Sequence, residues 1–514
     1  MLKQKENNES FFDSYVRDNF ISKDNKYVKI KSLINVDFIP ELVRDSYKNE
    51  NNRGNPSFDP RTLFLICIVE YLENLSDVKI VEKIAETPVL KWFGGLSPSD
   101  KTPDDSTVSL FRVQRMGEEK FKEAFYKIVG QIQSQGATAV WADIALLNVF
   151  QLLNKCRRNL LKAVLNAAGQ TKYDRLLKKY DFTLVRNPKN KQKHFEELIN
   201  ICRGLFDEVK ADKLLLRNKK VLREMRIMER ALSERGDEYF DNGGRKQKKE
   251  DVDKITWKMI NPSDPDASWG AKSKDEFFAG YKAEINIDHL YEFITAIGVV
   301  PGHKPEEWGA ANLLSEQKKY LGITPHHFLA DAKYSFGTTR AELKALGINN
   351  IWVPEVKPHL KENRLYSAYA FQWDFNLMNL ICPAGYPSEC MAHDDDKLGF
   401  DFRFNEDICA ECETRKCCTG AESCGRRVLI NHNWWDHKEG LKIMDMEEYL
   451  MMYKEQRYKI ERKNAERKNA ELKKHHFFGT ARYRGLSRMR IQAYLAAIAV
   501  NIKKWVAFAR GKLT

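Results

Sequence analysis

The chain of 514 residues carries 85 Lys and Arg against 72 Asp and Glu, which gives a formal net charge of +13. That length exceeds one ordinary domain, so we expect two to four units, and the basic excess suits a polyanionic partner, because each neutralised phosphate releases counterions. No apolar run approaches the roughly 20 residues that span a bilayer, and the polar N-terminus lacks the apolar core of a signal peptide, so we expect a cytoplasmic protein without membrane association.

Residues 1–135 are expected to form a helical N-terminal domain, because short apolar segments follow residues that cap helices. The expected N-caps are Asp59, Ser76 and Asp104, a further helix covers 118–133, and 27–34 forms a short strand. Arg112 and Arg115 are taken as exposed. Two interpretations stay open: a helix-turn-helix-like DNA-binding module, or a helical dimerisation or packing domain.

Two apolar segments each end in a carboxylate, as strands do when they deliver an acid to the edge of a sheet. The β-branched and aromatic run 137–143 ends in Asp143, and 328–331 ends in Asp331. The other expected elements are, in order, helices over 145–255, a hairpin over 280–288 and 293–301, a helix over 306–320, a helix over 338–346 and a strand over 350–354. This order resembles an RNase-H-like sheet with a helical insertion after its first strand.

A long helix expected over 446–476 supplies a third acid, Glu461 or Glu466. Phosphodiester cleavage needs charge neutralisation on the attacking and leaving oxygens, which two divalent metals provide. Mg²⁺ takes oxygen ligands, so two Asp at strand ends and a Glu from a facing helix suit such a site. The candidate catalytic and metal-binding residues, for Mg²⁺ or Mn²⁺, are Asp143, Asp331 and one of Glu461 and Glu466.

Seven of the ten cysteines lie between Cys382 and Cys424. In a reducing compartment such a cluster indicates a metal or free thiols before disulfides. Four of the thiols have a spacing compatible with Zn²⁺, and a loop of unliganded thiols is the alternative, since a second Cys-x-x-Cys pair is absent. The candidate zinc ligands are Cys382, Cys409 and Cys412 with either Cys417 or Cys418 as the fourth thiol, and Cys390, Cys424 and His393 are spare candidates.

The expected fold class is therefore α/β: an RNase-H-like mixed sheet with a helical N-terminal domain, a helical insertion after the first strand, and a Cys-rich insertion before the last catalytic helix. An amphipathic helix over 486–505 is expected to pack back on the sheet. The expected domains are 1–135 (helical), 136–357 with 446–514 (catalytic core), 145–255 (helical insertion) and 358–445 (Cys-rich insertion).

Several segments resemble those of bacterial insertion-sequence transposases of the DDE type, and the resemblance covers most of the chain. The segments that carry it are 55–63, 101–112, 280–282, 329–334, 459–466 and 481–485. It implies an enzyme that binds double-stranded element-end DNA as a homodimer or larger synaptic complex on the nucleoid. Such an enzyme hydrolyses a strand with Mg²⁺ at its site and then uses the freed 3′-hydroxyl to attack target DNA.

The third acid lies in a tandem repeat, because Glu461-Arg-Lys-Asn-Ala is followed at once by Glu466-Arg-Lys-Asn-Ala. The resembling family shows an Arg four residues before its Glu and a Lys seven after it, and both registers satisfy this. Five residues turn a helix by about 500°, so only one Glu can face the metals. The DNA-binding residues that the resemblance implies are Arg457, Arg462, Lys468, Lys473, Arg482 and Arg484. Because a Thr follows the last Cys in the resembling family, as Thr419 does here, the resemblance also implies Cys382, Cys409, Cys412 and Cys418 as the zinc ligands, with Cys417 as a spare.

Two other functions stay open. The repeat at Glu461 and Glu466 suits a decayed or repurposed transposase that binds DNA without catalysis, because a slipped helix misplaces the third acid. An RNase-H-like nuclease without strand transfer would share the acids, and it would yield cleaved DNA without a joined product.

Overall fold

The computed structural model groups its residues into two compact units, Met1–Pro305 with Ala465–Thr514, and Glu306–Asn464. The residues that it describes are 14–15, 19, 21–22, 24–47, 57–131, 138–141, 148–185, 188, 190–236, 258–271, 277–288, 292–304, 309–330, 332–335, 337–355, 366–376, 378–394, 399–419, 424–457, 466–476 and 478–509. Among them, no helix is long and apolar enough to cross a membrane.

The first unit begins with short helices, and three of them, α4, α5 and α7, start at the expected capping residues. The helices are α2 (Lys26–Leu33), α3 (Ile39–Val43), η1 (Arg44–Tyr47), α4 (Pro60–Glu73), α5 (Asp77–Glu86), α6 (Pro88–Phe93), α7 (Asp105–Leu110), η2 (Phe111–Met116) and α8 (Gly117–Gly130). Asp59 accepts a hydrogen bond from the backbone N–H of Arg61 at 2.8 Å, and Asp104 accepts one from that of Thr107 at 2.6 Å. These caps, with that of Ser76, are confirmed.

The strand expected over 27–34 is wrong, because these residues form the helix α2. The side chain of Asn25 accepts from the backbone N–H of Tyr27 at 2.9 Å and so opens the helix. Tyr27 and Ile30 are buried at helical spacing. The alternation of Tyr, Val, Lys and Ile that imitates a strand is thus outweighed by the cap and by this buried face.

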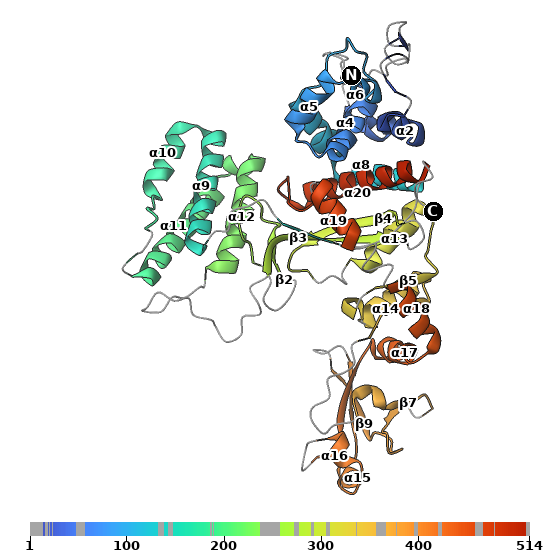
Figure 1. The fold of residues 1–514 in the computed structure, drawn as a ribbon. Coiled ribbons are helices and arrows are strands. Elements are labelled where there is room, and N and C mark those ends of the chain that lie inside the picture. Colours follow the sequence, from blue (N-terminus) through green and yellow to red (C-terminus); the bar gives the residue numbers. More distant parts are fainter. Residues whose placement is uncertain are drawn as a thin grey trace. The chain divides into compact units, whose positions relative to one another are not determined.

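A central helix, α20 (Leu486–Ala509), is enclosed by the N-terminal helices and the sheet. Its residues 491–502 are all buried. This stretch therefore has no exposed face, and the expectation of an amphipathic helix is wrong for it. It packs on α4, α8 and the strand β4 (Ile294–Pro301), and Figure 1 shows α8 and α20 side by side along the sheet. Twelve of the fourteen residues of α4 are buried as well, so these two helices form the core of the unit.

The sheet of the first unit is antiparallel and is built around β3 (Phe277–Ile287), which pairs with β1 (Thr138–Trp141), β2 (Ser268–Ala271) and β4. Tyr281 lies opposite Pro301 and Ile287 opposite Ile294, so the hairpin expected over 280–301 is confirmed. Trp141, at the end of β1, lies opposite Gly280.

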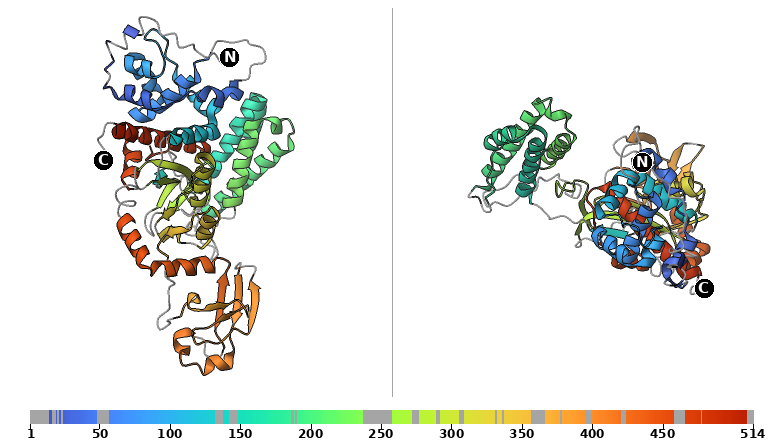
Figure 2. Two further views of the ribbon diagram at one scale, coloured as in Figure 1. Left: turned by 90° about the vertical axis from the view of Figure 1, so that its right-hand side faces the viewer. Right: turned by 90° about the horizontal axis from the view of Figure 1, so that it is seen from above.

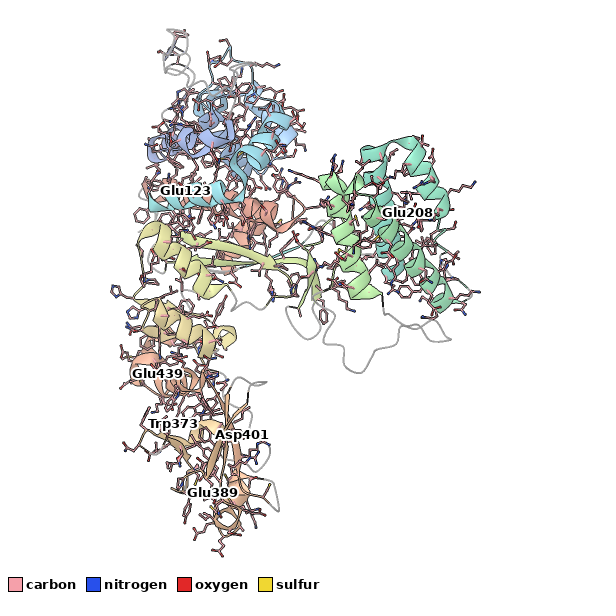
Figure 3. The ribbon with its side chains drawn as sticks, turned by 180° about the vertical axis from the view of Figure 1, so that it is seen from behind. Glu123, Glu208, Trp373, Glu389, Asp401 and Glu439 are labelled. Atoms are coloured by element: carbon pink, nitrogen blue, oxygen red, sulfur yellow. The ribbon has the colours of Figure 1, made fainter. Side chains whose placement is uncertain are left out.

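Between β1 and β2 the chain forms a helical bundle, in the stretch where helices were expected. Its helices are α9 (Val149–Ala168), α10 (Gln170–Lys179), α11 (Lys191–Ala211), η3 (Leu215–Arg217) and α12 (Lys219–Arg235). A separate cluster of buried residues runs from Phe150 to Met259. Figure 2 shows the α-helices of the bundle packed on one another. Glu208, labelled in Figure 3, joins α11 to α10 through an ion pair with Lys179 at 2.5 Å. The bundle therefore has its own core.

The second unit opens with α13 (Ala310–Leu321), β5 (His327–Leu329), η6 (Ala332–Tyr334), α14 (Gly337–Ala345) and β6 (Asn350–Trp352). Strands β5 and β6 are parallel, with Phe328 opposite Ile351. One sheet carrying both acid-bearing strands was expected. The described pairings instead put β1 with β3 and β5 with β6, in separate sheets. A three-residue strand such as β5 offers few ladder hydrogen bonds, and its described partner is β6.

The Cys-rich part of the second unit is a set of small antiparallel sheets. Its elements are η7 (Ala368–Ala370), β7 (Gln372–Asp374), β8 (Asn379–Ile381), β9 (Cys390–Asp394), β10 (Gly399–Arg403), α15 (Glu406–Ala410), α16 (Arg415–Cys418) and β11 (Arg427–Asn431). Asp401 on β10, labelled in Figure 3, pairs with Arg427 on β11 at 2.5 Å. Trp434, 1% exposed, closes the core of this part.

The long helix expected over 446–476 is described as two helices. After α17 (Trp434–Met444), helix α18 covers Glu447–Arg457 in the second unit and α19 covers Glu466–His475 in the first. Residues 458–465 lie outside the described residues.

Candidate functional site

Most of the predicted catalytic acids fall outside the part of the chain that the structure describes. These are Asp143, two residues beyond the described end of β1, Asp331, just after β5, and Glu461. Glu466 is the first residue of α19, and its side chain is not described. The convergence of the acids on one site therefore stays a prediction.

Helix α19 has one buried and one exposed side. Leu472 is 0% exposed, whereas Lys473 is exposed. Glu466 and Lys473 are seven residues apart, which places them within about 20° of each other around a helix. They occupy a side of α19 about 100° around from Leu472. The side of the helix on which Glu466 stands in sequence register also carries Lys473, an exposed residue.

The predicted DNA-binding residues have different environments. Lys473 and Arg484 are exposed. Arg482 is 15% exposed, and its guanidinium is occupied by Glu70 at 2.5 Å. Arg457 and Lys468 lie in α18 and α19 with side chains outside the described residues, as does the whole of Arg462. Contact with DNA stays a prediction for all six.

The four preferred cysteines line one pocket. Cys382, Cys409, Cys412 and Cys418 face it together with Arg415 and Arg426. Cys417 and Cys424 are not among its lining residues, and the side chains of Cys390 and His393 are not described. Within the described residues no group of three or more His, Cys, Asp or Glu side chains is arranged to hold a metal ion, so the four thiols would have to draw closer to bind one.

Local backbone structure presents these thiols. The turn Cys382-Pro-Ala-Gly385 is closed by a hydrogen bond from the N–H of Gly385 to the carbonyl of Cys382 at 2.9 Å, and Gly385 has φ 91°, a conformation that favours glycine. The N–H of Tyr386 lies 3.3 Å from the Cys382 sulfur. Burial raises the pKa of the Cys418 thiol, Arg426 lowers it, and the other three thiols raise it further. A bound cation would attract the thiolates, offset their mutual repulsion and so lower the pKa of the thiols.

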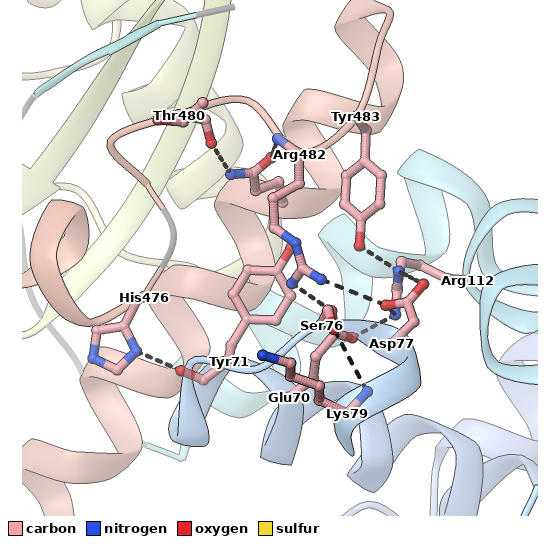
Figure 4. A network of polar contacts seen from close by, with 11 residues as sticks. Glu70, Tyr71, Ser76, Asp77, Lys79, Arg112, His476, Thr480, Arg482 and Tyr483 are labelled. Atoms are coloured by element: carbon pink, nitrogen blue, oxygen red, sulfur yellow. Dashed lines mark hydrogen bonds and ion pairs between the residues drawn. The ribbon is translucent and has the colours of Figure 1, made fainter. Parts of the chain in front are cut away.

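A second cluster of charged groups joins the N-terminal helices to the segment after α19 (Figure 4). Glu70 on α4 is 0% exposed and binds two guanidinium groups, those of Arg112 and Arg482. Arg112 also binds Asp77 at 3.0 Å and donates to the hydroxyl of Tyr483. Two carboxylates thus face two guanidinium groups in the buried interior, a balance that buried charges require.

The expectation that Arg112 is exposed is wrong, since this side chain is 1% exposed. Burial raises the pKa of Glu70 above its usual range, and the guanidinium groups of Arg112 and Arg482 oppose that rise and favour the carboxylate. Arg115 is also occupied and donates to the backbone carbonyl of Ser46. Neither arginine offers a free guanidinium to DNA in this structure.

His476, the first residue after α19, forms another link to the same N-terminal helix. Its Nδ1 lies 2.8 Å from the carbonyl oxygen of Tyr71, and its Nε2 lies 3.2 Å from the ammonium of Lys503 on α20. A carbonyl only accepts and an ammonium only donates, so these partners require the neutral tautomer with the proton on Nδ1. Burial, together with the neighbouring charge of Lys503, lowers the pKa of His476 to about 4.

Sequence reasoning did not find this polar cluster. Glu70 lies inside an otherwise apolar helix and is 412 residues from Arg482. The only sequence signal is a charged residue within a buried helical pattern, which must find a partner. That signal marks Glu70 as paired, but it does not identify the partners.

Two family models match the chain. Residues 15–114 match a transposase domain (DUF772), and residues 381–506 match a transposase DDE domain. The first covers α4, α5 and Arg112, and the second covers the thiol pocket, α19 and most of α20. No curated protein and no solved structure gives a match.

Proposed function

We propose, from the premise that the chain belongs to the insertion-sequence transposases with a DDE domain, that it cleaves element-end DNA and transfers the strand to target DNA. The two matched domains carry this proposal. The net charge of +13 suits double-stranded DNA as the partner. We further propose action on the nucleoid as a homodimer or larger complex, because two element ends must be held together.

The proposed catalytic core is RNase-H-like and comprises residues 136–357 and 446–514. The order of its elements supports this assignment, since β1, the β3–β4 hairpin, α13, β5, α14 and β6 follow one another as in such a core. The proposed catalytic acids are Asp143, Asp331 and one Glu. Three carboxylates form a donor set that suits Mg²⁺ or Mn²⁺, and the metal when bound neutralises charge on the attacking and leaving oxygens.

Of the two candidate glutamates, we place the third acid at Glu466, the one whose backbone the structure describes. It opens α19, which packs on α4 and α20, and it belongs to the same unit as β1, the strand that leads to Asp143. Lys473, at the family's spacing of seven, is exposed on the same side of the helix. Glu461 stays the alternative.

Single substitutions test the acids on a duplex that carries the native flanks of this coding sequence, with Mg²⁺. Asp143→Ala and Asp331→Ala are each expected to abolish cleavage while retaining DNA binding in a gel shift. Glu466→Gln is expected to abolish cleavage, and Glu461→Gln is expected to retain it. The reverse result would identify Glu461 as the third acid. Cleavage that survives Asp331→Ala would overturn the DDE assignment.

The products distinguish the other functions. Cleaved DNA without a joined strand would indicate a nuclease. Binding without cleavage by the wild-type chain would indicate an inactive transposase-derived protein, which the tandem repeat at Glu461 and Glu466 favours.

We also propose that the thiol pocket binds one Zn²⁺ through Cys382, Cys409, Cys412 and Cys418, because these four alone among the described cysteines line it and Zn²⁺ takes four thiolates. Purified protein is expected to hold about one zinc per chain. Cys409→Ser should lose it, and Cys424→Ser, which changes an exposed thiol outside the pocket, should keep it. Zinc-free wild-type protein would contradict the assignment.

A further inference from the structure

We propose that Glu70, on the N-terminal helix α4, is a positioning residue for the reaction, because it anchors the end of α19 and thereby the place of Glu466. This inference rests on the proposed function. It departs from the interpretation of the N-terminal helices as a DNA-binding module and gives a specific role to the other interpretation, a dimerisation or packing domain.

The first anchor is the ion cluster. The Glu70 carboxylate binds the guanidinium of Arg482 at 2.5 Å with one oxygen and that of Arg112 with the other. Arg112 in turn donates to the Tyr483 hydroxyl. The N-terminal domain therefore holds two consecutive residues of the segment that follows α19 (Figure 4).

Four further hydrogen bonds hold the same segment. His476 Nδ1 binds the Tyr71 carbonyl of α4 at 2.8 Å. Gln492 of α20 accepts from the N–H of Arg482 at 2.9 Å and donates to the carbonyl of Thr480 at 3.0 Å. Asp264, fully buried, accepts from the N–H of Gly485 at 3.0 Å and from the hydroxyl of Tyr281 on β3 at 2.5 Å. The segment 476–485 is thus tied to α4, to α20 and to the central strand of the sheet.

The distance between Glu466 and the anchored end of α19 determines how far Glu466 would move if the helix tilted. Glu466 lies nine residues before the last residue of α19, about 13 Å along the helix at 1.5 Å per residue. A tilt of about 10° at the anchored end would therefore displace it by roughly 2 Å. A misplacement of about 1 Å in a catalytic constellation can reduce the rate about 100-fold. The anchor at 476–485 is close enough to control catalytic geometry without touching DNA or metal.

Two glutamates on α4 allow a matched test. Glu70→Gln removes the charge that holds Arg482. Glu73→Gln, on the same helix, removes a carboxylate that pairs with Lys26 and Lys83 inside the N-terminal domain. We expect Glu70→Gln to lower the single-turnover cleavage rate 10- to 100-fold at saturating DNA, with DNA affinity within twofold of wild type. Glu73→Gln should leave both within twofold, and Glu70→Asp should recover part of the rate.

Hydrogen–deuterium exchange gives a readout that does not depend on catalysis. Glu70→Gln should speed exchange in residues 466–485, and Glu73→Gln should speed it only near Lys26 and Lys83. If Glu70→Gln fails to fold, Tyr483→Phe, which removes one hydroxyl of the cluster, should produce the same exchange pattern more weakly. Unchanged exchange in 466–485 in the folded variants would overturn the anchor. A wild-type chain that does not cleave would overturn the proposed function, and the exchange data would still decide on the anchor.

Discussion

At the scale of single residues, the second unit contains a buried pair of opposite charges. Arg340, 3% exposed, binds Glu355, 2% exposed, at 2.6 Å, and His437 Nδ1 lies 3.0 Å from the other oxygen of Glu355. Replacing one partner of such a pair leaves an uncompensated buried charge, which costs far more than an exposed pair contributes.

Arg340→Met is therefore expected to destabilise the second unit by about 3–5 kcal/mol. Lys344→Met is the control, because Lys344 lies one turn further along α14 and pairs with Asp436 and Glu439 at 30% exposure. Its loss should cost less than about 1 kcal/mol. Urea midpoints followed by tryptophan fluorescence measure both. Equal shifts in the two variants would show that burial does not set the strength of these pairs.

At the scale of elements, the junction of α4 with α19 contains a titratable group. His476 has a pKa of about 4 in the fold against about 6.5 in an unfolded chain. The unfolded state binds the proton first, so stability is present above about pH 6.5 and is lost as the pH falls towards 4. The groups that face the imidazole are Tyr71, Lys503, Glu471 and His475.

Lowering the pH from 7 to 5 should therefore weaken the docking of α19 by roughly 2 kcal/mol, at about 1.4 kcal/mol per pH unit below 6.5. The measurement is hydrogen exchange in 466–476 at the two pH values, corrected for intrinsic rates. His476→Gln can donate to the Tyr71 carbonyl but does not titrate, so its exchange should change less between the two values. A variant with the same pH dependence as wild type would remove His476 as the cause.

The elements also show what the sequence predicts and what it does not. The caps at Asp59, Ser76 and Asp104 were predictable because the capping side chain and the N–H it binds lie within three residues of each other. The β3–β4 hairpin was predictable from local alternation. The burial of residues 491–502 of α20 was not, because it depends on α4 and α8, hundreds of residues away. The candidate zinc thiols could be grouped from their spacing and from the family resemblance, whereas the pairing of Glu70 with Arg482 needs the folded chain.

At the scale of the whole molecule, the chain contains two helical parts of different kinds. The bundle α9–α12 has its own core and enters the chain between two strands. The N-terminal helices do not stand apart in this way, since α4 and α8 pack on α20, whose residues 491–502 are buried on every side. The bundle α9–α12 is thus an insertion with its own core, whereas the N-terminal helices share a core with α20.

Deleting residues 1–135 should therefore expose the apolar surface of α20, and we expect the remaining chain to aggregate, because burial is worth about 25 cal/mol for each Å². Replacing 145–257 with a short Gly/Ser linker is the matched deletion. It removes a similar number of residues, and we expect it to leave a monodisperse protein with α20 protected from exchange, because β1 and β2 both keep their pairing with β3. Size-exclusion chromatography separates the outcomes. A soluble, folded chain without residues 1–135 would show that the N-terminal domain is detachable, and Glu70 could not then anchor α19.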